Sequence, residues 1–268
     1  MERDIQMSKS RIDYADWAWG VVDGCNAIRE GCRNCYAKAM ADRFWGERKF
    51  SEVRTHSERL EEVVKLKPQV VFVAPMGDLF HKNVPDEFIY RVFVLMAIKA
   101  RQHSYIIFTK RPERMRDFMS LNHEFAQEHI WLGVSVSTQK DVDEFLPILC
   151  DTIAGKRIVS VEPFLSRVTF KNEWLSGMYQ GELKHDALGT EYHEIKYGPR
   201  INGVFCGCES GTNARPQPPY IDIIHLRDQC FQNGVAFYLK QWRDNNFKIS
   251  HKPFLDGRQW LEMPERKG

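Results

Sequence analysis

Three cysteines lie close together near the start of the chain, at Cys25, Cys32 and Cys35, with the spacing C-x6-C-x2-C. A disulfide uses only two thiols and a buried structural thiol needs no neighbours, so we expect all three to be thiolate ligands of one metal centre. A structural zinc ion takes four protein ligands, commonly from two C-x2-C pairs, and only one such pair is present. Three thiolates can instead hold a cubane iron-sulfur cluster with one iron open to a substrate or cofactor. Zinc completed by a distant residue, and reduced thiols without metal, stay as alternatives.

The chain has 268 residues, of which 43% are hydrophobic and 28% charged, a composition typical of a soluble globular protein. Its net charge of +2 neither requires nor excludes a nucleic-acid partner. The longest apolar runs, such as residues 70–75, are too short to span a bilayer, and the N-terminus has no apolar signal segment. Seven cysteines, an odd number with three in one group, favour a reducing compartment. We therefore expect a cytoplasmic protein that does not bind membranes.

Seven short apolar runs follow one another along the chain, and most are separated by segments with helical spacing of apolar residues. Runs that are apolar on both faces and joined by long crossovers are typical of a parallel sheet buried under helices. The fold that we predict is α/β, a complete or partial β/α barrel. The predicted strands cover residues 19–23, 70–73, 105–109, 130–136, 157–161, 203–207 and 235–239.

Polar residues recur at the carboxyl ends of these runs. In a β/α barrel the carboxyl ends of the strands form one mouth, which is where such folds carry their chemistry. The three cysteines follow the first run and precede a predicted helix over residues 36–48, so we expect them at the same mouth. The strand-end residues are Asp78, Lys110, Arg111, Ser135, Glu162, Glu209 and Lys240.

A single domain over residues 1–268 accounts for the whole pattern. Residues 170 to 200 break the rhythm of strands and helices, and we interpret them as an irregular, lid-like insertion. Residues from about 243 to 268 are a C-terminal extension to the predicted barrel.

Several segments carry a resemblance to a known family. The cysteines followed by Tyr36 and a helix look like those of a radical S-adenosylmethionine (SAM) enzyme, although the first gap has six residues rather than three. The chain as a whole resembles a family of phage and bacterial proteins of unassigned function, found beside three-Cys-motif partner proteins and similar to the spore photoproduct lyase branch. The segments that carry this resemblance are 24–25, 31–37, 76–81, 109–115, 131–136, 160–163, 209–211, 214–216 and 240–242.

The resemblance implies a TIM-barrel-like fold of the radical SAM type. Its cofactors would be a 4Fe-4S cluster on Cys25, Cys32 and Cys35 and SAM chelated to the open iron, and one electron would then produce a 5′-deoxyadenosyl radical. It also implies a nucleobase, nucleotide or nucleic acid as substrate, a three-Cys-motif protein as partner, and an electron donor such as flavodoxin or ferredoxin.

The strand-end residues would then bind the cofactor. Asp78, after Gly77, is the predicted acceptor for the amino group of SAM, and Lys110 or Arg111 pairs with its carboxylate. Gly77 and Ser135 are also predicted to bind the cofactor, and Glu162 and Glu209 are placed toward the ribose or the substrate. Cys208 is predicted as a fourth ligand or as a thiol that gives up a hydrogen atom, and with Glu209 it forms the predicted catalytic pair.

Two other functions stay open. The metal could merely fasten the first loop of a protein that binds nucleic acid or a partner, without catalysis. A metal-independent hydrolase could instead use Asp78, Glu162 and Glu209 as acid and base groups. Structural alternatives also exist for single residues: Asp78 as the cap of a turn, Glu162 in an ion pair with a neighbouring strand-end cation such as Arg111, and Cys150 and Cys230 as buried core residues.

Overall fold

The computed structural model describes residues 8–185, 191–211, 213–244, 246 and 248–265. The predicted domain, insertion and C-terminal extension include residues 1–7, 186–190 and 266–268, which lie outside the described residues.

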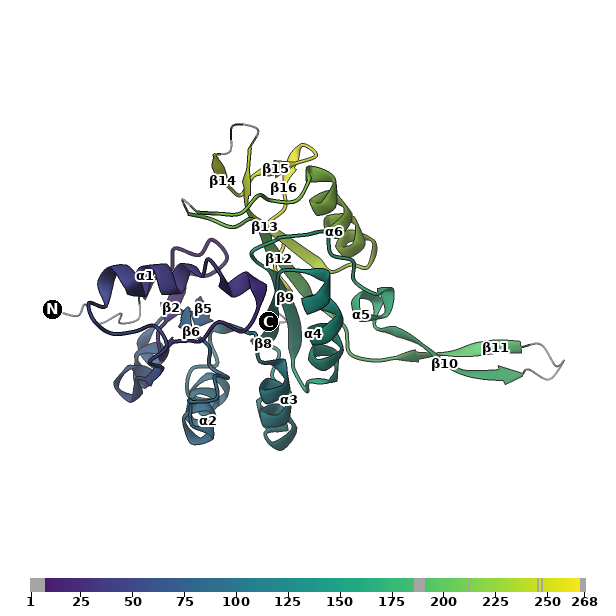
Figure 1. Cartoon of the computed structure of the whole chain (residues 1–268). Helices are drawn as coiled ribbons and strands as arrows, with labels where there is room; N and C mark the ends of the chain where they lie inside the picture. Colours follow the sequence, from purple (N-terminus) through teal and green to yellow (C-terminus); the bar gives the residue numbers. More distant parts are fainter. Residues whose placement is uncertain (1–7, 186–190, 212, 245, 247, 266–268) are drawn as a thin grey trace.

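A nine-stranded sheet forms the centre of the molecule, in the order β1-β2-β5-β7-β8-β9-β12-β13-β14 (Figure 1). Its strands from β2 to β13 run parallel to their neighbours, whereas β1 and β14 are antiparallel. Six of the predicted apolar runs coincide with strands, and the first is divided in two. The strands are β1 (Ser8–Lys9), β2 (Trp17–Trp19), β5 (Val70–Val73), β7 (Ser104–Thr109), β8 (Ile130–Val136), β9 (Lys156–Val161), β12 (Gly203–Gly207), β13 (Ala236–Arg243) and β14 (Ile249–His251).

The sheet stays open within the described residues, so the predicted complete barrel is wrong. Closing a barrel requires the two edge strands to pair with each other. Here β1 and β14 occupy the edges as short antiparallel strands, and among the described residues each pairs only with its neighbour in the sheet. The fold is therefore a mixed α/β structure with a large, mostly parallel sheet.

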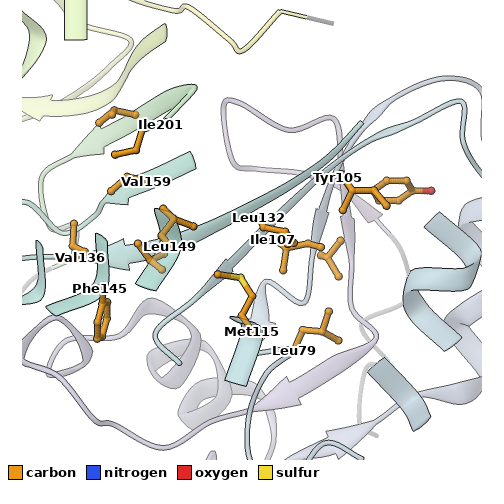
Figure 2. Packing of buried hydrophobic residues seen from close by; sticks show 14 of the residues in the cluster. Leu79, Tyr105, Ile107, Met115, Leu132, Val136, Phe145, Leu149, Val159 and Ile201 are labelled. Carbon is orange, nitrogen blue, oxygen red and sulfur yellow. The ribbon is translucent and has the colours of Figure 1, made fainter. Parts of the chain in front are cut away.

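The helices α2, α3, α4 and α6 cover one face of this sheet, because their apolar sides share a single core with strand residues such as Ile107 and Val159 (Figure 2). The opposite face carries Phe72, Ile106 and Trp131, and the terminal segments of the chain cover it. The helices are α1 (Tyr36–Phe44), α2 (Asp86–Val94) with its continuation η3 (Leu95–Lys99), α3 (Pro112–Leu121), α4 (Gln139–Asp151), α5 (Asn172–Ser176) and α6 (Tyr220–Gln232), with 3-10 helices η1 (Glu30–Cys32), η2 (Ser57–Lys65) and η4 (His123–Phe125).

The first predicted strand is interrupted at Gly20 and Val21. Its first part, β2, belongs to the main sheet, and its second part is β3 (Val22–Gly24). β3 lies between β4 (Arg54–Thr55) and β6 (Met76–Gly77) in a separate three-stranded sheet. This small sheet follows the carboxyl ends of β2 and β5, and the cysteines begin directly after β3.

Residues 170–200, expected to be irregular, contain α5 and an antiparallel hairpin of β10 (Met178–His185) and β11 (Glu191–Tyr197). The hairpin projects away from the sheet and its helices (Figure 1). A register shift between Gln180 and Leu183 interrupts the alternation of apolar and polar residues in β10. For this reason the sequence pattern did not predict β10 as a strand. The C-terminal extension forms a second small hairpin, β15 (Phe254–Leu255) and β16 (Arg258–Gln259).

Candidate functional site

The cysteine loop, residues 25–35, connects β3 to α1. It begins at Cys25, directly after β3, and ends at Cys35, which occupies the position before the first helical residue of α1. Cys25, Cys32 and Cys35 are all partly exposed, and none forms a disulfide. The structure therefore keeps three free thiols in one loop, at the carboxyl end of the first part of the sheet.

Cys25 lies beside an ion pair between Asp78 and Arg111. Arg111 Nη1 donates to Asp78 Oδ2 at 2.7 Å and to Cys25 Sγ at 3.6 Å. Burial raises the pKa of the Cys25 thiol, and the positive charge of Arg111 opposes this increase. Arg111 therefore favours the thiolate form that metal binding requires.

The carboxylate of Asp78 is fully engaged within the protein. It accepts hydrogen bonds from the backbone N–H groups of Phe80 and Lys110, at 2.9 and 3.2 Å, in addition to the Arg111 contact. The Thr109 hydroxyl also donates to it, at 2.8 Å from Oδ1. The contact from the Phe80 N–H caps the turn after β6, as the structural alternative predicted, and the contacts from Thr109 and Lys110 also join this turn to the end of β7. Within the described part of the chain, the Lys110 ammonium has no hydrogen-bond acceptor and no ion-pair partner.

The second half of the cysteine loop is anchored by Glu209 and Arg215, which lie between β12 and α6. Asn34, between the second and third cysteines, donates to Glu209 Oε2 at 2.9 Å. Arg215 Nη2 donates to Glu209 Oε1 at 2.6 Å, and Arg215 Nη1 donates to Glu30 Oε1 at 2.7 Å and to the Glu30 carbonyl at 3.1 Å. Burial alone would raise the pKa of Glu209, but the hydrogen bonds from Arg215 and Asn34 lower it. Glu209, predicted to be catalytic, holds the loop in place.

The middle of the cysteine loop packs on the carboxyl ends of β8 and β9. Gly31 is buried there, and a Cβ atom at this position would lie 2.2 Å from Ser137 Oγ and 3.6 Å from Pro163 Cδ. Only glycine allows this approach without displacing a neighbour. The loop is therefore fixed to the sheet at its beginning, middle and end.

Glu162, at the end of β9, forms a separate polar group with Lys240 and Tyr14. Its Oε2 atom lies 3.2 Å from Lys240 Nζ and 3.5 Å from the Tyr14 hydroxyl. The expected ion pair of Glu162 with a strand-end cation forms with Lys240, whereas Arg111, the cation that we named as an example, pairs with Asp78. Glu162 Oε1 is buried and has no hydrogen-bond partner among the described residues.

The other predicted residues have different surroundings. Gly77 lies against the backbone of β3, and a Cβ atom there would be 2.9 Å from the Val22 carbonyl oxygen. Ser135 faces Ser160 across the β8–β9 pair and is partly buried. Cys208 is buried in the core that the helices share, where burial raises its pKa to about 11. Its predicted catalytic role stays a prediction.

A family match covers nearly all of these elements. The profile of a family described as "Protein of unknown function (DUF5131)" matches residues 9–264, nearly the whole described chain. The chain belongs to the DUF5131 family. A comparison of this DUF5131 protein with curated proteins found no match. The described part of the chain contains no helix that is both long and apolar enough to cross a membrane.

A search of solved structures found a spore photoproduct lyase complexed with dinucleoside spore photoproduct. It is 13% identical in sequence, with a TM-score of 0.43 over 61% of this DUF5131 protein and 50% of the lyase chain. This chain thus spans about half the length of the lyase. A similarity this low carries no argument about function.

Three contacts in this DUF5131 protein were not predicted from the sequence. Asn34 and Arg215 anchor the cysteine loop, and Tyr14 approaches Glu162. Each pairing joins segments that are far apart along the chain, so spacing could not reveal it. His81 is also part of the site: its Nδ1 accepts from the backbone of Asn83, so its Nε2 donates to Asn26 at 2.8 Å.

The thiols of the cysteine loop can be compared with the ligands that a zinc ion and an iron-sulfur cluster require. Among the described residues, no three His, Cys, Asp or Glu side chains are close enough together to hold one metal ion. A mononuclear zinc ion needs such convergence, because Zn–S bonds are about 2.3 Å long. In a cubane cluster each thiolate binds a different iron, so the sulfur atoms stand farther apart. Three free thiols in one loop are the number of thiolates that a cubane cluster with one open iron requires.

Proposed function

We propose that this DUF5131 protein is a radical SAM enzyme in which Cys25, Cys32 and Cys35 hold a 4Fe-4S cluster. The observation that carries the proposal is the position of three free thiols in one loop over the carboxyl ends of a parallel sheet. When bound, the cluster supplies the electron that cleaves SAM and so provides a 5′-deoxyadenosyl radical.

The anchoring of the cysteine loop favours this function over a purely structural metal. The loop is already held by the Cys25–Arg111 contact, by Gly31 and by the Arg215–Glu30 ion pair. A metal is therefore not needed to fasten the loop to the sheet. Three thiols left free in a loop that needs no further support are better explained by a reactive centre.

The contacts of the strand-end residues refine their proposed roles. Both carboxylate oxygens of Asp78 already accept hydrogen bonds within the protein. We therefore assign Asp78 the role of orienting Arg111 beside Cys25, in place of binding the amino group of SAM. Lys110, without an acceptor among the described residues, is the proposed partner of the SAM carboxylate. Glu162 keeps one buried oxygen free and is the proposed acceptor for a hydroxyl group of the cofactor or substrate.

The same contacts argue against a hydrolase. Acid and base groups need a carboxyl that can exchange protons with a substrate. Asp78 and Glu209 each accept several hydrogen bonds, including one from an arginine, and Glu162 is paired with Lys240. Action on a nucleobase, nucleotide or nucleic acid stays a prediction from the family resemblance.

Anaerobic reconstitution tests the proposal. We expect about four irons per chain, and production of 5′-deoxyadenosine from SAM when dithionite is added. Replacing Cys25, Cys32 and Cys35 by alanine removes both, whereas Cys150→Ala, a change in the core on α4, retains them. One tightly bound zinc ion without cleavage of SAM would instead support the alternative of a structural metal.

A further inference from the structure

A cavity of about 290 Å³ is lined by the end of β13, the first residue of α6, β14 and β15. These elements lie together at one end of the molecule (Figure 1). The lining includes Trp242, which is buried, and the rings of Tyr220 and Phe254, which are 46% and 68% exposed. The volume is at the lower end of the range for small-molecule sites, so the cavity suits one ring system rather than a large ligand.

The two exposed rings are available for stacking. Within the described chain, neither Tyr220 nor Phe254 lies against another aromatic ring or a cation. Proteins that bind single-stranded nucleic acids hold the bases on such rings, because every base has a flat face that stacks on an aromatic side chain. The cavity therefore favours a planar aromatic ligand.

Unpaired positive charge stands beside the cavity. Ser250 of β14 is a lining residue, and the pairing of β13 with β14 continues to Lys248, whose carbonyl accepts from the Asp244 N–H at 2.9 Å. Lys248 therefore lies on the same face as Ser250, because side chains alternate along a strand. Lys252 directly precedes Pro253, another lining residue. Among the described residues, neither lysine ammonium has an acidic partner.

The single acid among the described lining residues has a structural task. Asp244 Oδ1 accepts from the backbone N–H groups of Asn246 and Lys248, at 2.8 and 3.0 Å, and so closes the turn between β13 and β14. Arg243, also in the lining, donates from Nη2 to the Glu209 carbonyl oxygen at 3.3 Å. Cations thus outnumber the acid around the cavity, which complements an anionic ligand.

We propose that this cavity binds an unpaired base of a single-stranded nucleic acid. The base stacks on Tyr220 and Phe254, and a neighbouring phosphate pairs with Lys248 or Lys252. In a duplex each base is already stacked on its neighbours, so two unoccupied rings select a base outside a duplex. The contact from Arg243 to Glu209 places the cavity beside the residues that anchor the cysteine loop.

This inference goes beyond the proposed function and does not depend on it. Stacking and phosphate contacts require no iron and no SAM, and no covalent bond forms or breaks. A protein segment fits the cavity less well, because an apolar side chain would cover the rings and leave Lys248 and Lys252 without an anion.

Fluorescence anisotropy tests the stacking, with the whole chain and, as the probe, a labelled single-stranded oligothymidylate of about 12 nucleotides. We expect Tyr220→Ala/Phe254→Ala to weaken the Kd at least about tenfold. Tyr220→Phe/Phe254→Tyr, which keeps both rings, should retain the affinity. Phe231→Ala, at a phenylalanine of α6 that is 64% exposed, is the matched control and should leave the Kd unchanged. Urea unfolding checks that each variant is folded.

The dependence of the Kd on salt tests the phosphate contacts. Each phosphate contact of a single strand contributes about 0.7 to the slope of log Kd against log salt concentration, so Lys248→Ala/Lys252→Ala should lower this slope by about 1.4. Lys65→Ala/Lys67→Ala, at two exposed lysines that precede β5, is the control and should leave the slope unchanged.

Several results would overturn the proposal, and each has its own meaning. An unchanged Kd in Tyr220→Ala/Phe254→Ala would exclude the cavity as the base site. An unchanged salt slope in Lys248→Ala/Lys252→Ala would exclude the phosphate contacts. Thymidine monophosphate that competes with the affinity of the oligonucleotide would assign the cavity to a free nucleotide, and a dimer that the aromatic double variant dissolves would assign it to a second copy. Because the assay needs no cluster, a protein that takes up no iron would refute the proposed function alone.

Discussion

The ion pair between Arg215 and Glu209 should be essential for the cysteine loop, and Arg215→Ala tests this. The Glu209 side chain is 4% exposed and that of Arg215 is 19% exposed. Removing the arginine side chain leaves a buried carboxylate that accepts from Asn34 and from the backbone N–H of residue 215. Breaking a buried pair in this way costs about 3–5 kcal/mol, and partial access of water to Arg215 places our expectation at about 3 kcal/mol.

Two measurements follow the effect of Arg215→Ala. Urea unfolding gives the loss of stability, and the reaction of the free thiols with a disulfide reagent gives the exposure of the cysteine loop, which also loses its contact to Glu30. We expect Cys32 to react faster in the variant. Adding Glu209→Gln should recover part of the stability, because the orphaned group is then uncharged.

A matched control is available on α1. Lys38 forms an exposed ion pair with Asp42, and each side chain is 55% exposed. Lys38→Ala should change the free energy of unfolding by no more than about 0.5 kcal/mol. A loss below about 1 kcal/mol for Arg215→Ala, with unchanged thiol reactivity, would refute the reasoning that this pair fixes the loop.

Three further predictions concern other parts of the structure. Burial and the charge of Arg111 lower the pKa of His81 from 6.5 to about 4, so between these pH values the unfolded chain binds a proton that the folded protein does not. The free energy of unfolding should therefore keep its full value above pH 6.5 and fall by about 3 kcal/mol as the pH drops to 4. His81→Asn should weaken this dependence of the free energy of urea unfolding on pH. Gly31→Ala places a methyl group against Ser137 and should cost about 2 kcal/mol in thermal or urea unfolding, part of which Ser137→Ala restores. Replacing residues 182–193 of the projecting hairpin by a short turn should change stability by less than about 1 kcal/mol, since this hairpin packs mainly on itself.

Clear results would contradict each of these. An unchanged pH profile in His81→Asn would mean that another group titrates in this range. A Gly31→Ala variant as stable as the wild type would show that the loop can move away from β8. Unfolding of the shortened hairpin variant would show that β10 and β11 support the core.

The sequence by itself determined the parallel strands from β5 to β13, the helices between them and the place of the cysteine loop. Local patterns suffice for these features: continuous apolar runs predict buried strands, and the i, i+3, i+4 spacing predicts helices. The residues that end each strand follow from the same pattern, because parallel strands bring their carboxyl ends to one edge. Cys25, Asp78 and Arg111 were therefore expected near each other, and they are in contact.

Only the tertiary structure decided which charges pair and how the sheet ends. Arg111 forms an ion pair with Asp78, and Glu162 forms one with Lys240. Which charges pair depends on the directions of the side chains at the strand ends rather than on separation along the chain. The open sheet results from two short antiparallel edge strands, which are too short to leave a periodic signal. The anchoring of the cysteine loop by Arg215 likewise joins segments that become neighbours only when the fold forms.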